Sequence, residues 1–270
     1  MHKSIGFIGA GNMAQAIIKG ILEKNIFSAS HVFTSDINKE KLDSFAKHFG
    51  ISVIQDNKEL VKKSDIIVFS IKPQTSAEVL NEIKSISNLS SKIFVTIMAG
   101  KKIDFIKTIL GKDVAVVRVM PNTPALLGKG MSVLSKDGSI KEKDFLEIKN
   151  IFASIGEVLE LPEDKMNIVT AISGSGPAYV YFLAECMIAT AIKKGLTQAQ
   201  AVLLVKQTLL GASSMLKHLD YDPKILRENV TSKGGTTEAA IKVFLEKNMA
   251  LIIEEAITAA KKRSRELSEE

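Results

Sequence analysis

A glycine-rich loop near the start of the chain, Gly9-Ala10-Gly11-Asn12-Met13-Ala14, constrains the fold more than any other feature. Residues 3–8 predict a short buried strand, and the apolar residues after the loop recur at helical spacing. The loop therefore has the pattern G-x-G-x-x-A between a strand and a helix, the context in which this pattern predicts dinucleotide binding. Gly9 permits a tight turn, Gly11 lets a pyrophosphate approach the backbone, and Ala14 lets the helix pack closely on the strand. The alternative is a glycine-rich turn in an ordinary α/β domain.

The helix after this loop is predicted to hold the pyrophosphate. The first turn of a helix has free N–H groups, and the helix dipole favours an anion there. The motif is weak when taken alone, and its position between a strand and a helix makes it informative. The loop residues expected to contact a dinucleotide are Ile8, Gly9, Ala10, Gly11, Asn12 and Met13.

The composition suits a globular protein that binds anions. The chain has 270 residues, 46% of them hydrophobic, which is enough for one large domain or two ordinary ones. Its net charge of +6 favours an anionic cofactor and substrate. The basic block Lys261-Lys262-Arg263 is followed by acidic residues, so we interpret it as a solvated helix face. No nucleic-acid partner is therefore expected.

The numbers and spacing of cysteine and histidine argue against a disulfide-stabilised protein and against a metalloprotein. Cys186 is the only cysteine, so the chain has no internal disulfide and suits a reducing compartment. Its apolar neighbours predict a buried, inert thiol rather than a catalytic one. The four histidines are scattered, and no spacing of His, Cys and carboxylates predicts a metal site.

The sequence is not typical of a membrane protein. Its first residues predict a strand rather than a signal peptide. No apolar run is expected to approach the ~18 residues of a membrane span. We therefore expect a soluble, cytoplasmic protein without a membrane partner.

Residues 1–161 predict the α/β class. Short β-branched runs alternate with amphipathic stretches, which implies βαβ units and a doubly wound parallel sheet of the Rossmann type. The predicted strands are 5–8, 32–35, 51–54, 66–71, 93–97 and 114–120, with two more at the far edge of the sheet, 131–134 and 157–161. The predicted helices between them are 38–49, 56–63, 75–86, 102–110 and 140–153.

Residues 162–270 predict an all-α domain. Residues 171–191 are hydrophobic nearly all round, which means that they are buried. The few helices of this region cannot cover that surface, so we predict a subunit interface in a homo-oligomer. The expected helices are 175–194, 197–216, one after Pro223, one after Thr236 and one near 247–266.

Ligands of open parallel sheets bind at the carboxyl ends of the strands, and several predicted strand ends carry distinctive residues. Asp36 lies 25 residues after Gly11, where an acidic residue bonds the adenine ribose and favours NAD over NADP. The alternative is a turn residue that caps the helix at Asn38. Lys72 either neutralises phosphate or substrate charge or is an ordinary surface lysine. The strand-end candidates for cofactor binding are Ser35, Asp36, Ile71, Lys72, Pro73, Met98 and Ala99, the last two in a run of small residues with room for a nicotinamide ribose.

Two stretches of the helical half are unusual. Residues 173–179 place small residues and a proline before the longest helix, which favours either a ligand contact or a tight helix entry. Residues 229–240 open a helix with two glycines followed by Thr236 and Thr237. Successive free N–H groups there would bind a carboxylate without an arginine. The alternative for either threonine is a helix cap, which can coexist with a ligand contact.

Together these motifs resemble one family, the pyrroline-5-carboxylate reductases, which make proline. The resemblance runs over nearly the whole chain and is most specific at 173–179 and 231–240, with further matches at 7–14, 72–74 and 118–124. It implies a Rossmann domain (1–161), a helical substrate-binding and dimerisation domain (162–270), homodimers, and in many members larger assemblies of dimers. The implied chemistry is hydride transfer from NADH or NADPH to the C=N carbon of pyrroline-5-carboxylate.

The resemblance also implies roles for particular residues. Thr237 would hydrogen-bond the imine nitrogen and is the catalytic candidate. Asn229 would reach the cofactor, and Asn57 would lie near its adenosine end. The residues implied to bind the substrate are Ser232, Gly235, Thr236, Thr237 and Ser175.

The chain departs from the family pattern at two positions. Lys233 stands where many members have proline, which predicts a less stiff loop. Asp36 stands where many members tolerate or bind a 2′-phosphate, and a carboxylate there repels that group by about 1 kcal/mol or more. We therefore expect NADH, or both cofactors, to be used.

Two other functions fit parts of the sequence. A β-hydroxyacid dehydrogenase would need a catalytic lysine in the helical half, for which Lys193 or Lys194 is available, but no glycine-rich motif of that family accompanies them. A non-catalytic dinucleotide-binding protein would share the fold alone. The dense polar groups of residues 232–237 argue against the second of these.

Overall fold

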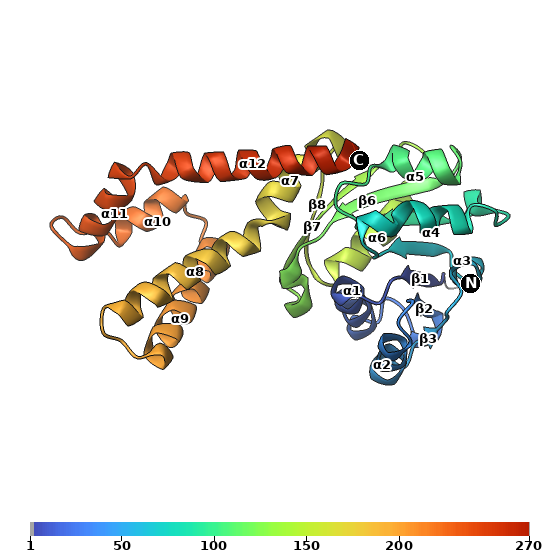
Figure 1. Cartoon of the computed structure of the whole chain (residues 1–270), viewed down its shortest axis with the longest axis horizontal. Coiled ribbons are helices and arrows are strands. Elements are labelled where there is room, and N and C mark those ends of the chain that lie inside the picture. Colours follow the sequence, from blue (N-terminus) through green and yellow to red (C-terminus); the bar gives the residue numbers. More distant parts are fainter. Residues whose placement is uncertain (1–2, 270) are drawn as a thin grey trace. The chain divides into compact units, whose positions relative to one another are not determined.

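Among residues 3–269, which the computed structural model describes, eight strands form one sheet in the order β3-β2-β1-β4-β5-β6-β7-β8 (Figure 1). Strands β1 to β6 run parallel, β7 is antiparallel to β6, and β8 is parallel to β7. The predicted Rossmann-type sheet with two further strands at its far edge is confirmed. The strands are β1 Ile5–Ile8, β2 Val32–Ser35, β3 Ser52–Val53, β4 Ile66–Phe69, β5 Ile93–Thr96, β6 Ala115–Met120, β7 Gly130–Lys136 and β8 Gly156–Glu160.

Helices cover both faces of this sheet. Strands β1, β4 and β5 are buried along their whole length, as expected for parallel strands with both faces covered. One apolar cluster joins the sheet to α1 (Asn12–Glu23), α2 (Lys39–Phe49) and α6 (Glu142–Ala153). The cluster on the other face contains residues of α3 (Asn57–Lys63), α4 (Ser76–Ile83) and α5 (Ile103–Leu110). The 3₁₀ turns of this region are η1 Ala29–His31, η2 Pro73–Thr75, η3 Leu89–Ser91, η4 Thr123–Leu127 and η5 Glu163–Lys165.

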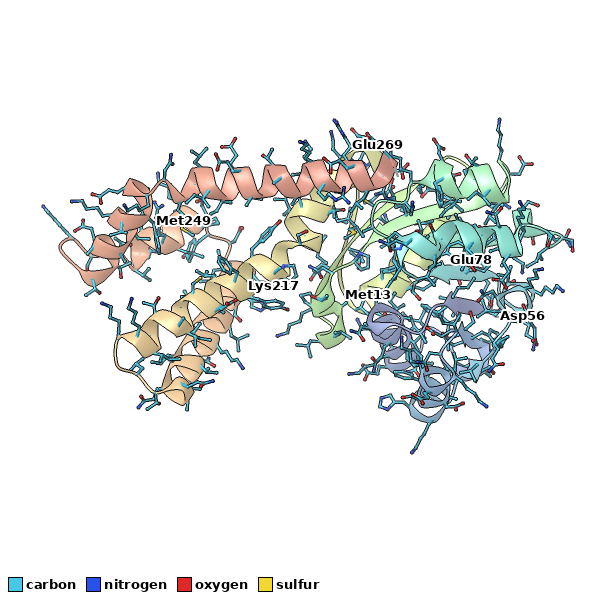
Figure 2. All side chains as sticks on the ribbon, viewed as in Figure 1. Met13, Asp56, Glu78, Lys217, Met249 and Glu269 are labelled. Atoms are coloured by element: carbon cyan, nitrogen blue, oxygen red, sulfur yellow. The ribbon has the colours of Figure 1, made fainter. Side chains whose placement is uncertain are left out.

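The helix boundaries follow local capping chemistry. The Asn38 side chain accepts from the backbone N–H of Lys41 at the start of α2, and Gly50 ends that helix in the left-handed conformation. Asp56 accepts from two N–H groups at the start of α3 (Figure 2). These caps satisfy groups that a helix end leaves unpaired, so the helices begin close to where the polar residues predict.

The rest of the chain is helical, as predicted. It continues from α7 (Met166–Val169) through a π turn, η6 (Thr170–Gly174), into α8 (Gly176–Lys193). Thr197 and Gln200 form a reciprocal capping box at the start of α9. The π turn was not predicted. The later helices are α9 Gln198–His218, α10 Pro223–Asn229, α11 Thr236–Glu246 and α12 Met249–Glu269.

The chain folds into two compact units. One contains the residues up to Ser175 together with those from Ala260 onward, and the other contains Gly176–Ala259. The last part of α12 belongs to the first unit, where the Ser264 hydroxyl donates to Asn167 at 3.0 Å. The division at 161/162 stays a prediction about domains.

The helices of the second unit expose much apolar surface in the single chain. None of the α8 residues is buried, and Phe182 in that helix is 66% exposed. Contacts within the single chain therefore do not provide the predicted burial of this helix. Cys186 is exposed as well, so the expectation of a buried thiol is wrong for the single chain.

In the part of the chain that the structure describes, one helical segment, Glu163–Lys193, is long and apolar enough to cross a membrane by length and composition. The expectation that no run approaches that length is wrong on this criterion. The evidence for a span is weak, because a single helix of a soluble protein passes the same test.

Candidate active site

The loop after β1 is held in a strained turn by its neighbours. Gly9 has a φ of +103°, and a Cβ at this position would lie 2.6 Å from the carbonyl oxygen of Ser70. The Gly9 N–H donates to the carbonyl of Ser35 at 2.7 Å, and the Ser70 hydroxyl donates to the Gly9 carbonyl at 2.6 Å. The position therefore requires glycine for both its backbone angle and its surroundings.

Gly11 differs, because no close protein contact requires a glycine there. Its φ is −90°, and a Cβ would meet only the Ser70 carbonyl oxygen, at 3.9 Å. Gly11 is the N-cap of α1 and provides no side-chain cap, which leaves the first N–H groups of that helix for a ligand. Ala14 is fully buried, as its predicted packing role requires, and Figure 2 marks Met13 in the same turn. The loop fits a pyrophosphate, since it combines open space with free donors.

Asp36 ties the end of β2 to this loop. One carboxylate oxygen accepts from the Ala10 N–H at 2.8 Å, and the other accepts from the Asn38 N–H at 2.9 Å. The turn role is thus present, although Asn38 itself caps α2. A carboxylate oxygen accepts more than one hydrogen bond, so these contacts leave capacity for a ribose hydroxyl. Ribose binding by Asp36 stays a prediction.

Asn57 is held between two side chains at the same end of the sheet. The buried Ser35 hydroxyl donates to Asn57 Oδ1 at 2.7 Å. Asn57 Nδ2 donates to Glu82 Oε2 on α4 at 2.8 Å. Sequence analysis selected Ser35 and Asn57 but missed Glu82, since no motif or spacing connects α4 to the start of α3.

The ends of β4 and β5 carry the other predicted cofactor residues. Lys72 is exposed, and its carbonyl accepts from the Thr75 hydroxyl at 3.0 Å, while Pro73 starts the turn η2. Met98 is buried in the core, and Ile71 and Ala99 are half-buried. The neighbouring position 100 requires a glycine for packing, because a Cβ there would lie 2.8 Å from the Leu267 carbonyl oxygen.

The small-residue stretch before α8 is organised by a side chain from the β6–β7 connection. Asn122 donates to the Ser173 carbonyl at 3.1 Å and accepts from the Met131 N–H at 2.8 Å. The Ser175 N–H closes the π turn on the Thr170 carbonyl at 2.8 Å. These contacts support the tight-entry interpretation of this stretch. Substrate binding by Ser175 stays a prediction.

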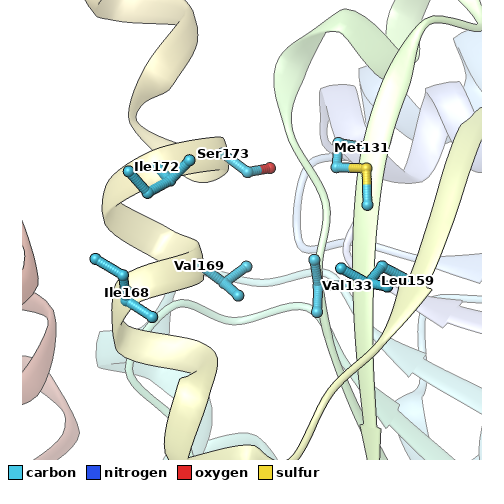
Figure 3. Close-up of a pocket in the computed structure, with 7 residues that line it drawn as sticks. All are labelled: Met131, Val133, Leu159, Ile168, Val169, Ile172 and Ser173. Carbon is cyan, nitrogen blue, oxygen red and sulfur yellow. The ribbon is translucent and has the colours of Figure 1, made fainter. Parts of the chain in front are cut away.

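An apolar pocket of about 300 Å³ lies against this turn (Figure 3). The Ser173 hydroxyl oxygen lies on its wall, is buried, and has no hydrogen-bond partner among the described residues. None of the lining residues is among those predicted to bind cofactor or substrate, although Ser173 belongs to the unusual stretch 173–179. The lining residues are Met131, Val133, Leu159, Ile168, Val169, Ile172 and Ser173.

The second unit presents the predicted carboxylate loop at the start of α11. Gly235 is the N-cap of this helix, and its N–H donates to the Ser232 carbonyl at 3.0 Å. A Cβ on Gly235 would lie 2.4 Å from Ser232 Oγ and 3.0 Å from the Ser232 carbonyl oxygen, so a larger residue would require the Ser232 side chain to move. Glu238 accepts from the Gly234 N–H at 2.7 Å and so holds the turn closed.

Thr236 and Thr237 are the first two residues of α11, and neither caps it. The alternative that these threonines serve as helix caps is therefore wrong. Within residues 3–269, the structure gives no hydrogen bond to the hydroxyls of Ser232, Thr236 and Thr237. Three hydroxyls thus accompany the free N–H groups of a helix start. Asn229, the last residue of α10, is exposed.

The structure brings the predicted residues together in two groups. In the first unit, hydrogen bonds connect the loop after β1 with Ser35, Asp36 and Asn57. In the second unit, Ser232 and Gly235 adjoin Thr236 and Thr237. A Rossmann-type sheet with a glycine loop after its first strand is typical of oxidoreductases that use a dinucleotide cofactor.

Comparisons with known proteins make this class more specific. Residues 163–267 match the family model for pyrroline-5-carboxylate reductase dimerisation, and residues 4–100 match the one described as NADP oxidoreductase coenzyme F420-dependent. The pyrroline-5-carboxylate reductase of Arabidopsis thaliana is 37% identical over 98% of this chain and 95% of its own.

Two solved structures are similar to this chain over nearly its whole length. The pyrroline-5-carboxylate reductase of Coxiella burnetii is 33% identical with a TM-score of 0.92, covering 99% of each chain. The Plasmodium falciparum pyrroline carboxylate reductase, solved with NADP bound, is 33% identical with a TM-score of 0.88, covering 98% of each chain. The chain belongs to the pyrroline-5-carboxylate reductase family. This assignment decides against the β-hydroxyacid dehydrogenase alternative.

Proposed function

We propose that this protein reduces L-1-pyrroline-5-carboxylate to L-proline, the last step of proline biosynthesis. The observation that carries the proposal is the loop of residues 232–237, where three hydroxyls without a hydrogen-bond partner in the described part of the chain lie at the start of α11, in a chain of this family. The hydroxyls and the free N–H groups of one helix start together offer several hydrogen-bond donors to a carboxylate.

The first unit supplies the residues that would hold the cofactor. The N–H groups at the start of α1 would bind its pyrophosphate, and Asp36 with Asn57 would bind its adenosine end. The relatives support this use, because one was solved with NADP bound. When bound, NADH or NADPH supplies the hydride for reduction of the C=N bond.

The second unit supplies the residues that would hold the substrate. The N–H groups of Thr236 and Thr237, with the Ser232 hydroxyl, would bind the carboxylate. The Thr237 hydroxyl would hydrogen-bond the ring nitrogen and orient the C=N bond. A ring iminium already carries a proton and a positive charge, so the protein needs no histidine to activate it. Asn229 and Ser175 complete the proposed set, toward the cofactor and the substrate respectively.

NADH is the favoured cofactor in this proposal, with NADPH as a second one. The Asp36 carboxylate accepts from two backbone N–H groups, which keeps it at the end of β2 where a 2′-phosphate would lie. A carboxylate held in place cannot swing away from that phosphate, so the repulsion persists.

The assembly in this proposal is a homodimer through the helical region, built further into a larger assembly of dimers. The dimerisation model matched from residue 163 supports the dimer and a domain boundary near 161/162. A partner copy would cover the exposed face of α8, which is apolar enough to resemble a membrane span. Nucleic acid and membrane are not among the proposed partners, and the proposed location is the cytoplasm.

The test is oxidation of NADH and NADPH, side by side, with pyrroline-5-carboxylate supplied and proline measured as product. The expected result is proline formation with both cofactors and the higher kcat/KM with NADH. Higher activity with NADPH would keep the reaction and remove the role of Asp36 in cofactor choice. Absence of proline with either cofactor would overturn the proposed function.

A further inference from the structure

The side chain of Asn57 is oriented by a carboxylate that the proposed reaction does not otherwise use. Glu82 Oε2 lies 2.8 Å from Asn57 Nδ2, and Ser35 Oγ lies 2.7 Å from Asn57 Oδ1. A carboxylate can only accept a hydrogen bond, so the Asn57 atom facing it must be the NH₂ group. Glu82 thereby determines which way the amide faces.

This orientation decides what Asn57 offers to a ligand. With one Nδ2 hydrogen directed to Glu82, the second Nδ2 hydrogen remains as a donor. The Ser35 hydroxyl donates its only hydrogen to Asn57 Oδ1, so toward other groups it can act only as an acceptor. Next to it, Asp36 is an acceptor as well. Asn57 and Asp36 therefore offer one donor beside a carboxylate acceptor, a pattern that suits the 2′,3′-diol of a ribose, whose hydroxyls both donate and accept.

We propose that Glu82 is a positioning residue for the adenosine half of the cofactor. It acts through Asn57 by holding the amide with its NH₂ group available, although Glu82 is not itself required to touch the cofactor. Glu82 is exposed on α4, so its removal leaves no cavity in the core. Without it, the amide is free to turn over and to present its oxygen where the donor was. The inference rests on the proposed use of a dinucleotide cofactor.

The experiment separates the two halves of the cofactor. The dissociation constant of ADP-ribose, which lacks the nicotinamide, is measured by titration calorimetry for the wild type, Glu82→Ala and Glu82→Gln. The kcat/KM with reduced nicotinamide mononucleotide, which lacks the adenosine, is measured for the same proteins. Glu78→Ala, one helical turn earlier on α4 (Figure 2), is the matched control because this exposed carboxylate is not part of the Asn57 contact.

We expect Glu82→Ala to bind ADP-ribose about 3- to 10-fold more weakly, the size of one hydrogen bond. Its kcat/KM with the mononucleotide should stay within about twofold of the wild type, since that ligand does not reach Asn57. Glu82→Gln can donate as well as accept, so it does not select the Asn57 NH₂ group and should bind ADP-ribose more weakly than the wild type. Glu78→Ala should bind ADP-ribose like the wild type. In an Asn57→Ala background, Glu82→Ala should cause no further loss.

Four results would overturn the inference while the proposed function stands. They are unchanged ADP-ribose binding by Glu82→Ala, an equal loss with the mononucleotide, a Glu82→Gln variant that binds ADP-ribose as tightly as the wild type, and additive losses in the double variant. If the wild type binds neither ADP-ribose nor NADH, the proposed function is overturned and this inference with it.

Discussion

The Asp36 carboxylate accepts a hydrogen bond from the Ala10 backbone N–H at 2.8 Å, so the residue that ends β2 also holds the loop that follows β1. Its second oxygen holds the Asn38 N–H. One side chain therefore connects the pyrophosphate end of the proposed cofactor site to its ribose end. Under the proposed function, we expect substitutions of Asp36 to affect loop geometry and cofactor choice together.

The substitution Asp36→Asn should shift cofactor preference toward NADPH. It removes the negative charge that opposes a 2′-phosphate, so the ratio of kcat/KM for NADPH over NADH should rise at least about fivefold. Steady-state kinetics with both cofactors measure this ratio. Asp43→Asn, an exposed residue on α2, removes the same charge nearby and should leave the ratio unchanged. An unchanged ratio in Asp36→Asn would leave Asp36 as a loop-holding residue only.

The two loop glycines should respond differently to alanine. Gly9→Ala places a Cβ against the Ser70 carbonyl at a positive φ and should cost about 2–4 kcal/mol of unfolding free energy. Gly11→Ala meets no such contact, so its melting temperature should stay near that of the wild type while NADH binding weakens about tenfold or more. Thermal unfolding and NADH fluorescence titration measure the two effects. Normal NADH binding by Gly11→Ala would contradict the proposed approach of the pyrophosphate.

The substitution Thr237→Val should lower turnover without much effect on the cofactor. Loss of the hydroxyl removes the proposed contact with the ring nitrogen, and kcat should fall about a hundredfold. The dissociation constant for NADH should stay within about twofold, because Thr237 is proposed to contact the substrate. Thr237→Ser keeps the hydroxyl and should recover most of the activity. Full turnover in Thr237→Val would rule out this role.

A charge on the apolar face of α8 should break the dimer. Phe182 is 66% exposed in the single chain, and Phe182→Glu would put a carboxylate into the interface that the dimerisation model implies. Light scattering coupled to gel filtration should show a monomer. Ser44→Glu adds the same charge to exposed α2 and should remain dimeric. A dimeric Phe182→Glu would place the interface elsewhere.

Part of the loss of folding stability at acidic pH should depend on Asp137. Burial works against ionisation, but the hydrogen bonds from Lys107 and Ser139 outweigh it and hold the pKa of Asp137 below its ordinary value of 3.8. A lowered folded-state pKa stabilises the fold above the unfolded-state pKa, and this stability is lost as the pH falls below 3.8 through the folded-state value.

Asp137→Asn should therefore be less stable than the wild type above about pH 5, and the difference should shrink at lower pH. Urea unfolding at several pH values measures this difference. Asp113→Asn, an exposed carboxylate, should show no such trend. If the difference in unfolding free energy between Asp137→Asn and the wild type does not depend on pH, the stabilising role given to the ionised Asp137 carboxylate is contradicted.

Local patterns were enough to predict most of the fold. The β-branched runs and the helical spacing after Gly11 placed the strands and helices close to their positions in the structure. Capping residues such as Thr197 marked helix starts, because they satisfy N–H groups of their own helix. The two motifs of the candidate site, around Gly9 and around Thr237, are likewise contiguous in the chain.

Contacts between distant segments were beyond such patterns. Glu82 lies 25 residues from Asn57, and the two meet only because α3 and α4 pack on the same face of the sheet. The run of small residues after β5 was predicted to leave room for a ligand, whereas the structure places the Leu267 carbonyl beside Gly100, the residue that follows Ala99. Within the π turn at Thr170–Gly174, the Ser173 carbonyl accepts a hydrogen bond from Asn122, which lies in a different element.

The sequence by itself determined the class of fold, the loop for a dinucleotide and the threonine-rich helix start, because each depends on residues that are neighbours along the chain. Only the tertiary structure decided that Asp36 holds Ala10, that Glu82 orients Asn57 and that the end of α12 belongs to the first unit. The physical reason is that a hydrogen bond depends on angle and on tenths of an ångström. Only the packed sheet and its helices bring distant side chains to that precision.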